Sequence, residues 1–141
     1  MSGKFEIKLK PVLAKARLAE GSARVEVGGV EIDVYPEPEA GGPDKGLTPL
    51  GLLASSLAAC EALMASLVAR MLGVGGVGVE VDVKADIQLG TGLRSLELKF
   101  KFSGVSEDLA RDIVKMVKSQ CPVYNSLARD GVKVKEEILV V

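Results

Sequence analysis

One stretch of this chain is apolar around almost its whole circumference when it is wound into a helix. Residues 47–73 read LTPLGLLASSLAACEALMASLVARMLG, with Glu61 as the charge near the middle. Thr48 is a candidate N-cap with Pro49 at the first helical position, and Gly73 is a candidate stop. A helix with hardly any polar face has to be covered on all sides. The stretch therefore predicts a central helix around which the fold is built.

The two sides of this helix differ in side-chain size. At about 100° per residue, one stripe collects large side chains and a thiol: Leu50, Leu53, Leu57, Cys60, Met64, Leu67 and Met71. The opposite side is small: Ala54, Ala58, Ala62, Ala65 and Ala69. A span of about 20 apolar residues could cross a bilayer, but a mid-span glutamate disfavours a membrane helix. We expect a sheet on one side and another helix on the other, and because 141 residues would struggle to supply that cover, an obligate homodimer.

The remaining segments predict an α+β fold with antiparallel sheets. Alternating apolar and polar residues predict these strands: Phe5–Leu9, Val25–Val27, Val30–Val34, Val77–Ile87, Leu96–Phe102 and Val132–Val140. Gly28-Gly29 between two such runs predicts a hairpin. A second helix is expected over Glu107–Gln120, with Ser106 as N-cap and Lys118 on its outer side. Strand groups separated by single helices favour one α+β domain over residues 1–141.

The chemistry available to the chain is narrowed by its two cysteines, Cys60 and Cys121, and by its lack of histidine. Without imidazole, a metal centre or a hydrolytic triad is disfavoured. The net charge is −1 with no tryptophan, which argues against nucleic acid as a partner. The N-terminal residues contain no apolar signal-like run, so we expect a cytoplasmic protein without a membrane partner. In that reducing compartment a cysteine pair is more often reactive than structural.

Two motifs surround the cysteines. TPLGLLASSLAACEAL ends just after Cys60, and CPVYNSL begins at Cys121. Together with the cysteine spacing and the order of strands and helices, they resemble the OsmC/Ohr family of osmotically inducible and organic-hydroperoxide-resistance proteins, over nearly the whole chain. The resemblance implies an OsmC-like intertwined homodimer, with long helices back to back and antiparallel sheets outside. It also implies a peroxidase cycle in which Cys60 attacks an organic hydroperoxide, Cys121 resolves the sulfenic acid as a disulfide, and an external dithiol reductant, with no bound cofactor or metal, restores both thiols.

The chain departs from the family at one position. In the family an N-terminal arginine and a glutamate ten residues before the first cysteine help to activate that thiol, and the glutamate position is Leu50 here. Arg17 is the candidate arginine, and Arg24 stays open as an alternative. Glu61 could replace the missing carboxylate only if the helix turned it toward the thiol, because adjacent helical residues point about 100° apart.

Three interpretations of the thiols remain at this point. With Leu50, Leu53 and Met64 nearby, an apolar pocket would favour a bulky organic hydroperoxide. Loss of the carboxylate at Leu50 could instead mark a branch that binds a small apolar ligand or senses oxidants with slow turnover. In the third interpretation both cysteines are only packed, as buried cysteines often are. A position at a helix C-terminus would raise the pKa of Cys121 and suit a resolving role. Tyr124 and Asn125 after it could line the pocket, but a surface turn is the favoured interpretation.

Overall fold

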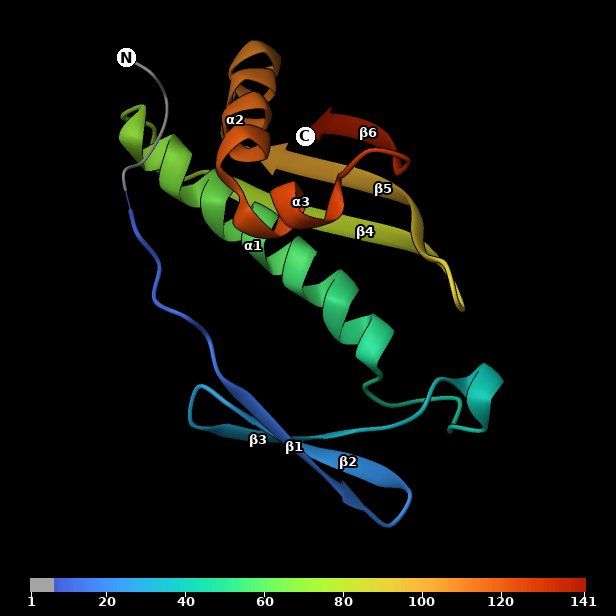
Figure 1. The fold of residues 1–141 in the computed structure, drawn as a ribbon. Helices are drawn as coiled ribbons and strands as arrows, with labels where there is room; N and C mark the ends of the chain where they lie inside the picture. The colour runs from blue at the N-terminus through green and yellow to red at the C-terminus, as the bar shows by residue number, and fades with distance from the viewer. Residues whose placement is uncertain (1–6) are drawn as a thin grey trace. The chain divides into compact units, whose positions relative to one another are not determined.

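The computed structural model describes residues 7–141 (Figure 1). The chain divides into two compact units, one formed by Glu6–Leu53 and the other containing Ala54–Val141. The long helix α1, Pro49–Met71, begins in the first and continues in the second. The expectation of a single domain over 1–141 stays a prediction. Of the strand expected at Phe5–Leu9, the first two residues lie outside the described part, and residues 7–9 are not in a strand.

The first unit contains a three-stranded antiparallel sheet in the order β1-β2-β3. Its strands are β1 (Ala14–Ala19), β2 (Ser22–Val27) and β3 (Val30–Val34). The hairpin between β2 and β3 is confirmed, and its turn needs glycine because Gly28 and Gly29 have φ of 57° and 76°. β1 was missed, since its sequence AKARLA is rich in alanine, which has low strand propensity. A short 3₁₀ turn, η1 (Pro38–Ala40), interrupts the loop that leads to α1.

The second unit contains a mixed sheet in the order β4-β5-β6. β4 (Gly78–Gln88) and β5 (Gly92–Ser103) form an antiparallel hairpin. β6 (Lys133–Val140) lies parallel to β5, which corrects the expectation of antiparallel pairing throughout. The reason lies in the connection, because the two helices between β5 and β6 carry the chain back so that both strands run in the same direction.

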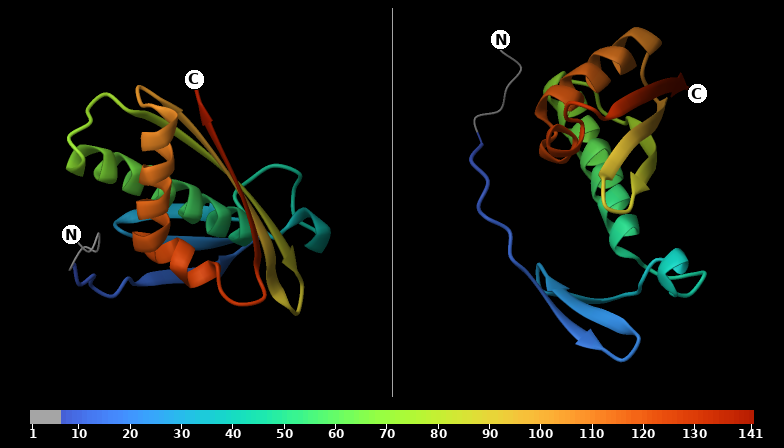
Figure 2. Two further views of the ribbon diagram at one scale, coloured as in Figure 1. Left: turned by 90° about the horizontal axis from the view of Figure 1, so that it is seen from above. Right: turned by 45° about the vertical axis from the view of Figure 1, so that its right-hand side comes forward.

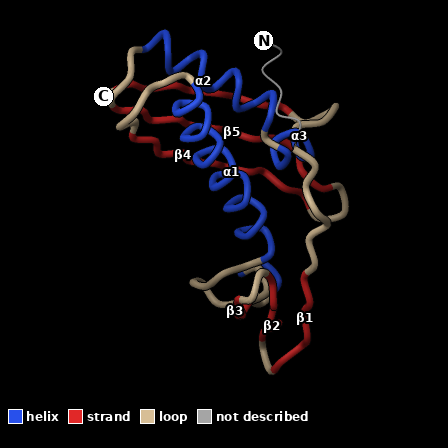
Figure 3. The backbone as a smooth tube through the Cα atoms, turned by 90° about the vertical axis from the view of Figure 1, so that its left-hand side faces the viewer, coloured by secondary structure: helices blue, strands red, loops and turns tan. Residues whose placement is uncertain are grey.

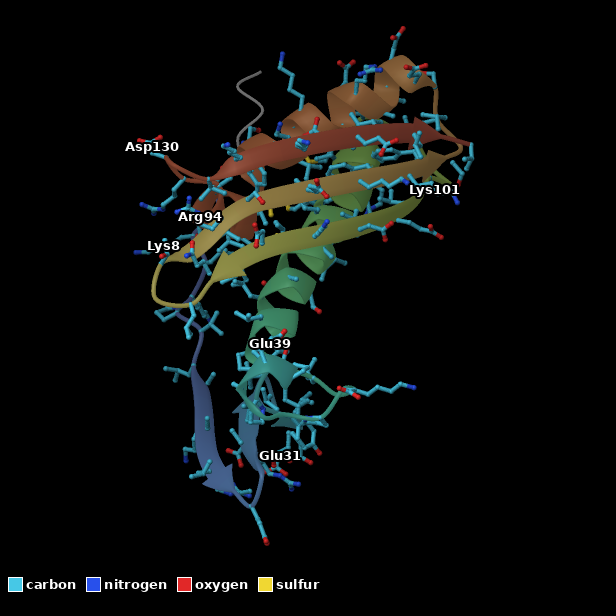
Figure 4. The ribbon with its side chains drawn as sticks, turned by 90° about the vertical axis from the view of Figure 1, so that its right-hand side faces the viewer. Lys8, Glu31, Glu39, Arg94, Lys101 and Asp130 are labelled. Carbon is cyan, nitrogen blue, oxygen red and sulfur yellow. The ribbon has the colours of Figure 1, made fainter. Side chains whose placement is uncertain are left out.

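Both long helices cover one face of this sheet. α2 (Glu107–Gln120) runs across α1 on the same side, as the tube and ribbon views show (Figures 2 and 3). The opposite face of the sheet points its charged side chains to solvent, Arg94 and Lys101 among them (Figure 4). The expected α+β class is therefore confirmed, with a helical layer on one face of the sheet and a solvated opposite face.

The helix ends follow the local sequence signals. Thr48 Oγ1 accepts a hydrogen bond from the Gly51 N–H at 3.0 Å, and Ser106 Oγ accepts one from the Leu109 N–H at 3.2 Å. α1 ends at Met71, and Gly73 two residues later has a left-handed φ of 78°. These caps confirm the predicted boundaries of both helices to within a residue or two.

The core lies between the helices and the inner face of the sheet. Its large, fully buried side chains are Phe100, Phe102, Leu57, Leu96, Leu98, Ile113, Val68, Val114 and Val117. By length and composition α1 could cross a membrane, with a mean hydropathy of 1.8 over its most apolar window. In this structure, however, it serves as a core helix whose buried face packs against protein.

The buried face of α1 is not the predicted stripe. It consists of Leu57, Glu61, Ala65, Val68 and Ala69. From the predicted stripe Leu57 is buried and Cys60 and Met64 are half-buried, whereas Leu50 and Met71 are 38% and 46% exposed. A helix apolar on every side does not specify which face turns inward. In the tertiary structure the face with small alanines packs against the core, because those side chains allow close approach of neighbouring elements. Glu61 lies on this face and is buried with it.

Candidate active site

The two thiols meet in the core of the second unit. Cys60 lies in the middle of α1 and Cys121 follows the last residue of α2. Both cysteines are free, and the Cys121 thiol donates a hydrogen bond to Cys60 Sγ at 2.8 Å. A disulfide bond is about 2.05 Å long, so the two sulfurs are in contact without being covalently joined. Cys60 and Cys121 are 61 residues apart in sequence, yet the fold brings their sulfur atoms into contact. This contact favours the peroxidase and the ligand-binding or sensing interpretations over the interpretation that both cysteines are only packed.

Cys121 is held by two helices at once. Its backbone N–H donates to Val117 O at 2.8 Å and so closes the last turn of α2. Its Sγ accepts from the Tyr124 N–H at 3.4 Å and thereby caps α3 (Pro122–Leu127). The expectation that Tyr124 and Asn125 lie in a surface turn was wrong, because Pro122 at the first position starts a new helix too short to show periodicity. Tyr124 is half-buried beside the thiol.

The environment of Cys121 keeps its proton in place. Burial is the main cause that raises the pKa of this thiol well above its ordinary value. The hydrogen bond to Cys60 and the nearby Glu61 carboxyl act in the same direction, and the Tyr124 N–H opposes them. The direction agrees with the sequence-based expectation, but its main cause is desolvation. Cys121 is therefore a neutral thiol at physiological pH.

A buried carboxyl lies beside this thiol pair. Glu61 is fully buried, and neither of its carboxylate oxygens has a hydrogen-bond partner among the residues that the structure describes. Burial raises the pKa of Glu61 to about 7, the Cys121 thiol lowers it, the Glu136 carboxylate raises it, and the Lys118 ammonium lowers it. Although Glu61 follows Cys60 on the helix, the rotation of α1 turns it inward, toward the second thiol.

An ion pair borders the same cluster. Lys118 Nζ lies 2.9 Å from Glu136 Oε2 and 5.8 Å from the centre of the Tyr124 ring. Burial opposes the charge on Lys118, but the hydrogen bond and charge of Glu136 outweigh it, so the pKa of Lys118 is raised. Lys118 was expected on the outer side of α2, yet its long side chain reaches inward along the sheet edge.

Glu136 was not identified from the sequence, although a signal was present. In β6 it has the same alternation phase as the half-buried Val134 and Ile138 and pairs in register with the buried Leu98, but Glu136 itself is exposed. A glutamate in phase with the apolar residues of an alternating strand is a position at which an ion pair can be expected. The partner is Lys118, and only the packing of α2 beside β6 reveals it.

The predicted arginines lie in the first unit, where each has a carboxylate partner. Arg17 lies 3.7 Å from Glu26. Arg24 makes two hydrogen bonds to Asp33, at 3.1 and 3.2 Å. Because Cys60 belongs to the other unit, the choice between Arg17 and Arg24 as its activator stays a prediction.

The predicted apolar pocket also stays a prediction. Leu50 and Leu53 belong to the first unit, and the Leu50 N–H at the start of α1 donates to Glu37 Oε2 at 3.3 Å. Met64 is half-buried and packs against the core of the second unit. A hollow of about 450 Å³ lies instead over the solvated face of the sheet, lined mostly by charged side chains and by neither thiol. Within residues 7–141 no group of three or more His, Cys, Asp or Glu side chains is arranged to hold a metal ion.

Comparisons with known proteins agree with this architecture. Residues 42–137 match the OsmC-like protein family. An OsmC-like protein from Mycoplasma pneumoniae has a TM-score of 0.82 at 24% identity, covering 94% of this chain and 98% of that one. An organic hydroperoxide resistance protein OsmC from Legionella pneumophila has a TM-score of 0.75 at 23% identity, with 94% and 99% covered. The organic hydroperoxide resistance protein OhrB of Bacillus subtilis has a TM-score of 0.67 at 22% identity, with 93% and 99% covered. No curated protein sequence matches this chain.

Proposed function

This chain belongs to the OsmC-like protein family, and from that premise we propose that it is a thiol peroxidase that reduces organic hydroperoxides. Peroxide-related redox chemistry is supported by structural neighbours that are named organic hydroperoxide resistance proteins. The observation that carries the proposal is the 2.8 Å contact between Cys60 and Cys121 in their reduced state.

The proposed cycle oxidises Cys60 first. Its thiolate attacks the terminal oxygen of the hydroperoxide, an S–O bond forms, the O–O bond breaks, and the alkoxide leaves and takes up a proton as the alcohol. Cys60 is thereby oxidised by two electrons to the sulfenic acid. Cys121 Sγ then attacks Cys60 Sγ, the S–O bond breaks, and water leaves as the disulfide forms. An external dithiol reduces that disulfide and returns both thiols.

The electrostatics support this division of roles. A thiolate is the reactive form of cysteine, and the raised pKa of Cys121 keeps that residue protonated. Cys60 accepts the hydrogen bond that Cys121 donates, at 2.8 Å between the two sulfurs. The resolving thiol is already in contact with the atom that it would attack.

A homodimer is part of the proposal. In the first unit every residue of β1 is exposed, and Leu18 is 90% exposed; in the second unit Leu63 of α1 is 72% exposed. Large apolar side chains left open in this way mark surfaces for association. A second copy would cover them, complete the apolar pocket for the hydroperoxide, and present Arg17 or Arg24 to a thiol, in a cytoplasmic protein.

The ligand-binding or oxidant-sensing alternative has one observation in its favour. Position 50 carries leucine in place of the family glutamate, and the carboxylate near it, from Glu37, is engaged by the helix N-terminus instead. If the loss of the carboxylate at position 50 prevents efficient turnover, hydroperoxide reduction with dithiothreitol will be slow while an apolar ligand still binds.

Intact mass spectrometry after one equivalent of cumene hydroperoxide tests the proposal. We expect the parent protein to lose two hydrogens, the Cys121→Ser variant to gain one oxygen, and the Cys60→Ser variant to stay unchanged. Hydroperoxide consumption by Cys60→Ser at the parental rate would contradict the assignment of Cys60. No change in the parent over minutes would move the ligand-binding alternative to first place.

A further inference from the structure

Glu61 is a buried acid with no fixed partner at the point where the two thiols meet. Its side chain is fully buried, and neither oxygen accepts a hydrogen bond from any residue in the described range 7–141. A buried carboxyl without a partner costs several kcal/mol, so its retention calls for an explanation other than stability.

The neighbouring thiol explains why the carboxyl lacks a partner. Cys121 has one proton to donate: its Sγ lies 2.8 Å from Cys60 Sγ, and the same thiol interacts with the Glu61 carboxyl and lowers its pKa. The Glu61 carboxyl is nevertheless close enough for the two groups to perturb each other's pKa. A rotation about the Cβ–Sγ bond of Cys121 would redirect the same proton from Cys60 to Glu61.

We propose that Glu61 is the proton acceptor of the resolving step, taking the proton of Cys121 as that thiol attacks the oxidised Cys60. This inference rests on the proposed peroxidase function. The Cys121 S–H bond breaks, its electron pair forms the new S–S bond, and the S–O bond of the sulfenic acid breaks with its electrons on the hydroxyl. The proton passes through Glu61 to that hydroxyl, which leaves as water. Glu61 returns to its starting state, so atoms and charges balance.

The resolving step needs such a base because burial holds the proton on Cys121. The charged and titratable groups that act on this site are Lys118 from α2, Glu136 from β6, Cys60 on α1 itself, and Tyr124 at the start of α3. Lys118 carries a proton already, and Glu136 is engaged in its ion pair. Glu61 is the carboxyl left to accept, and its pKa of about 7 makes both of its forms available near neutral pH.

A single-turnover experiment with Glu61→Gln separates the two chemical steps. Reduced protein is mixed with one equivalent of cumene hydroperoxide and quenched at intervals. Intact mass spectrometry then measures the amounts of sulfenic acid and of disulfide. Since a positioned base contributes about 100-fold or more, we expect Glu61→Gln to form sulfenic acid at the parental rate but to close the disulfide at least about 100-fold more slowly. Glu61→Asp, which restores a carboxyl, should recover part of the rate.

The matched control is Glu97→Gln, the same substitution on the solvated face of the sheet, where Glu97 pairs with Lys84. It should behave as the parent does. In the parent, the rate of disulfide closure should rise with pH through a midpoint near 7, the pKa of Glu61, and that midpoint should be absent from Glu61→Gln. Because the midpoint is measured on the unsubstituted protein, it tests the role of Glu61 as proton acceptor even if Glu61→Gln does not fold.

Each remaining outcome is decisive. Disulfide closure in Glu61→Gln within about threefold of the parental rate would overturn the inference, as would a parental closure rate without a midpoint near neutral pH. Loss of sulfenic acid formation in Glu61→Gln would also overturn it, by assigning Glu61 to the first step. Failure of Cys121→Ser to form any sulfenic acid would instead refute the proposed function itself.

Discussion

Replacing Glu61 should make the protein more stable at alkaline than at acidic pH, relative to the parent. The substitution is Glu61→Met, which keeps a side chain of similar length and removes the buried acid. Replacing a buried charge by an apolar group of similar volume is often neutral or stabilising. The size and the pH dependence of the gain follow from the pKa of this carboxyl.

The magnitude follows from the difference between the folded and the unfolded states. Burial raises the pKa of Glu61 from 4.5 to about 7, and at about 1.4 kcal/mol per pH unit this difference corresponds to about 3 kcal/mol. The folded state binds this proton more tightly, so between those two pH values it holds more protons than the unfolded chain. The contribution of this proton binding to the free energy of unfolding is therefore fully present below about pH 4.5. It is lost as the pH rises through about 7.

Urea unfolding under reducing conditions, at one protein concentration, measures the effect. The free energy of unfolding is compared between parent and Glu61→Met from about pH 5 to about pH 8. We expect the advantage of the variant to grow by about 2.5 kcal/mol across that range, because pH 5 already lies above the unfolded value of 4.5. Glu97→Met on the solvated face serves as the control and should track the parent. Parallel curves for the parent and Glu61→Met would refute the reasoning, because they would mean that the buried carboxyl is not perturbed.

Three further substitutions test the packing. Leu57→Ala removes a fully buried side chain of α1 and should cost about 3 kcal/mol in urea unfolding; a loss below about 1 kcal/mol would mean that the site lies at a looser face. Gly104→Ala should cost at least about 2 kcal/mol, because φ is 81° and a Cβ would lie 2.7 Å from a backbone oxygen. Gly90→Ala has the same left-handed φ of 82° with nothing nearby, and equal losses for the two would contradict the predicted steric contact. Lys118→Met removes a partly exposed ion pair with Glu136 and a cation that lowers the pKa of Glu61. It should therefore destabilise the fold by no more than about 1 kcal/mol and shift the pH midpoint of disulfide closure upward; an unchanged midpoint would exclude this coupling.

Local signals fixed the boundaries of the elements. Thr48 and Ser106 cap the two long helices as their sequences predict, and Gly28-Gly29 closes the predicted hairpin. These features depend on groups within a few residues of one another, so a single sequence contains all that they need. The motifs around Cys60 and Cys121 likewise sufficed to indicate the family, which residues 42–137 match.

What the sequence by itself determined was therefore the order, the type and the ends of most elements, and the family to which the two cysteine motifs belong. Tertiary structure alone decided which face of α1 turned inward, because a helix apolar all round has no preferred face. It also made β6 parallel to β5, brought Lys118 to Glu136, and placed Cys121 against Cys60 with Glu61 beside them. These arrangements join residues far apart in sequence, and their geometry is fixed by how the helices and the sheet fill one core, a property that no local pattern carries.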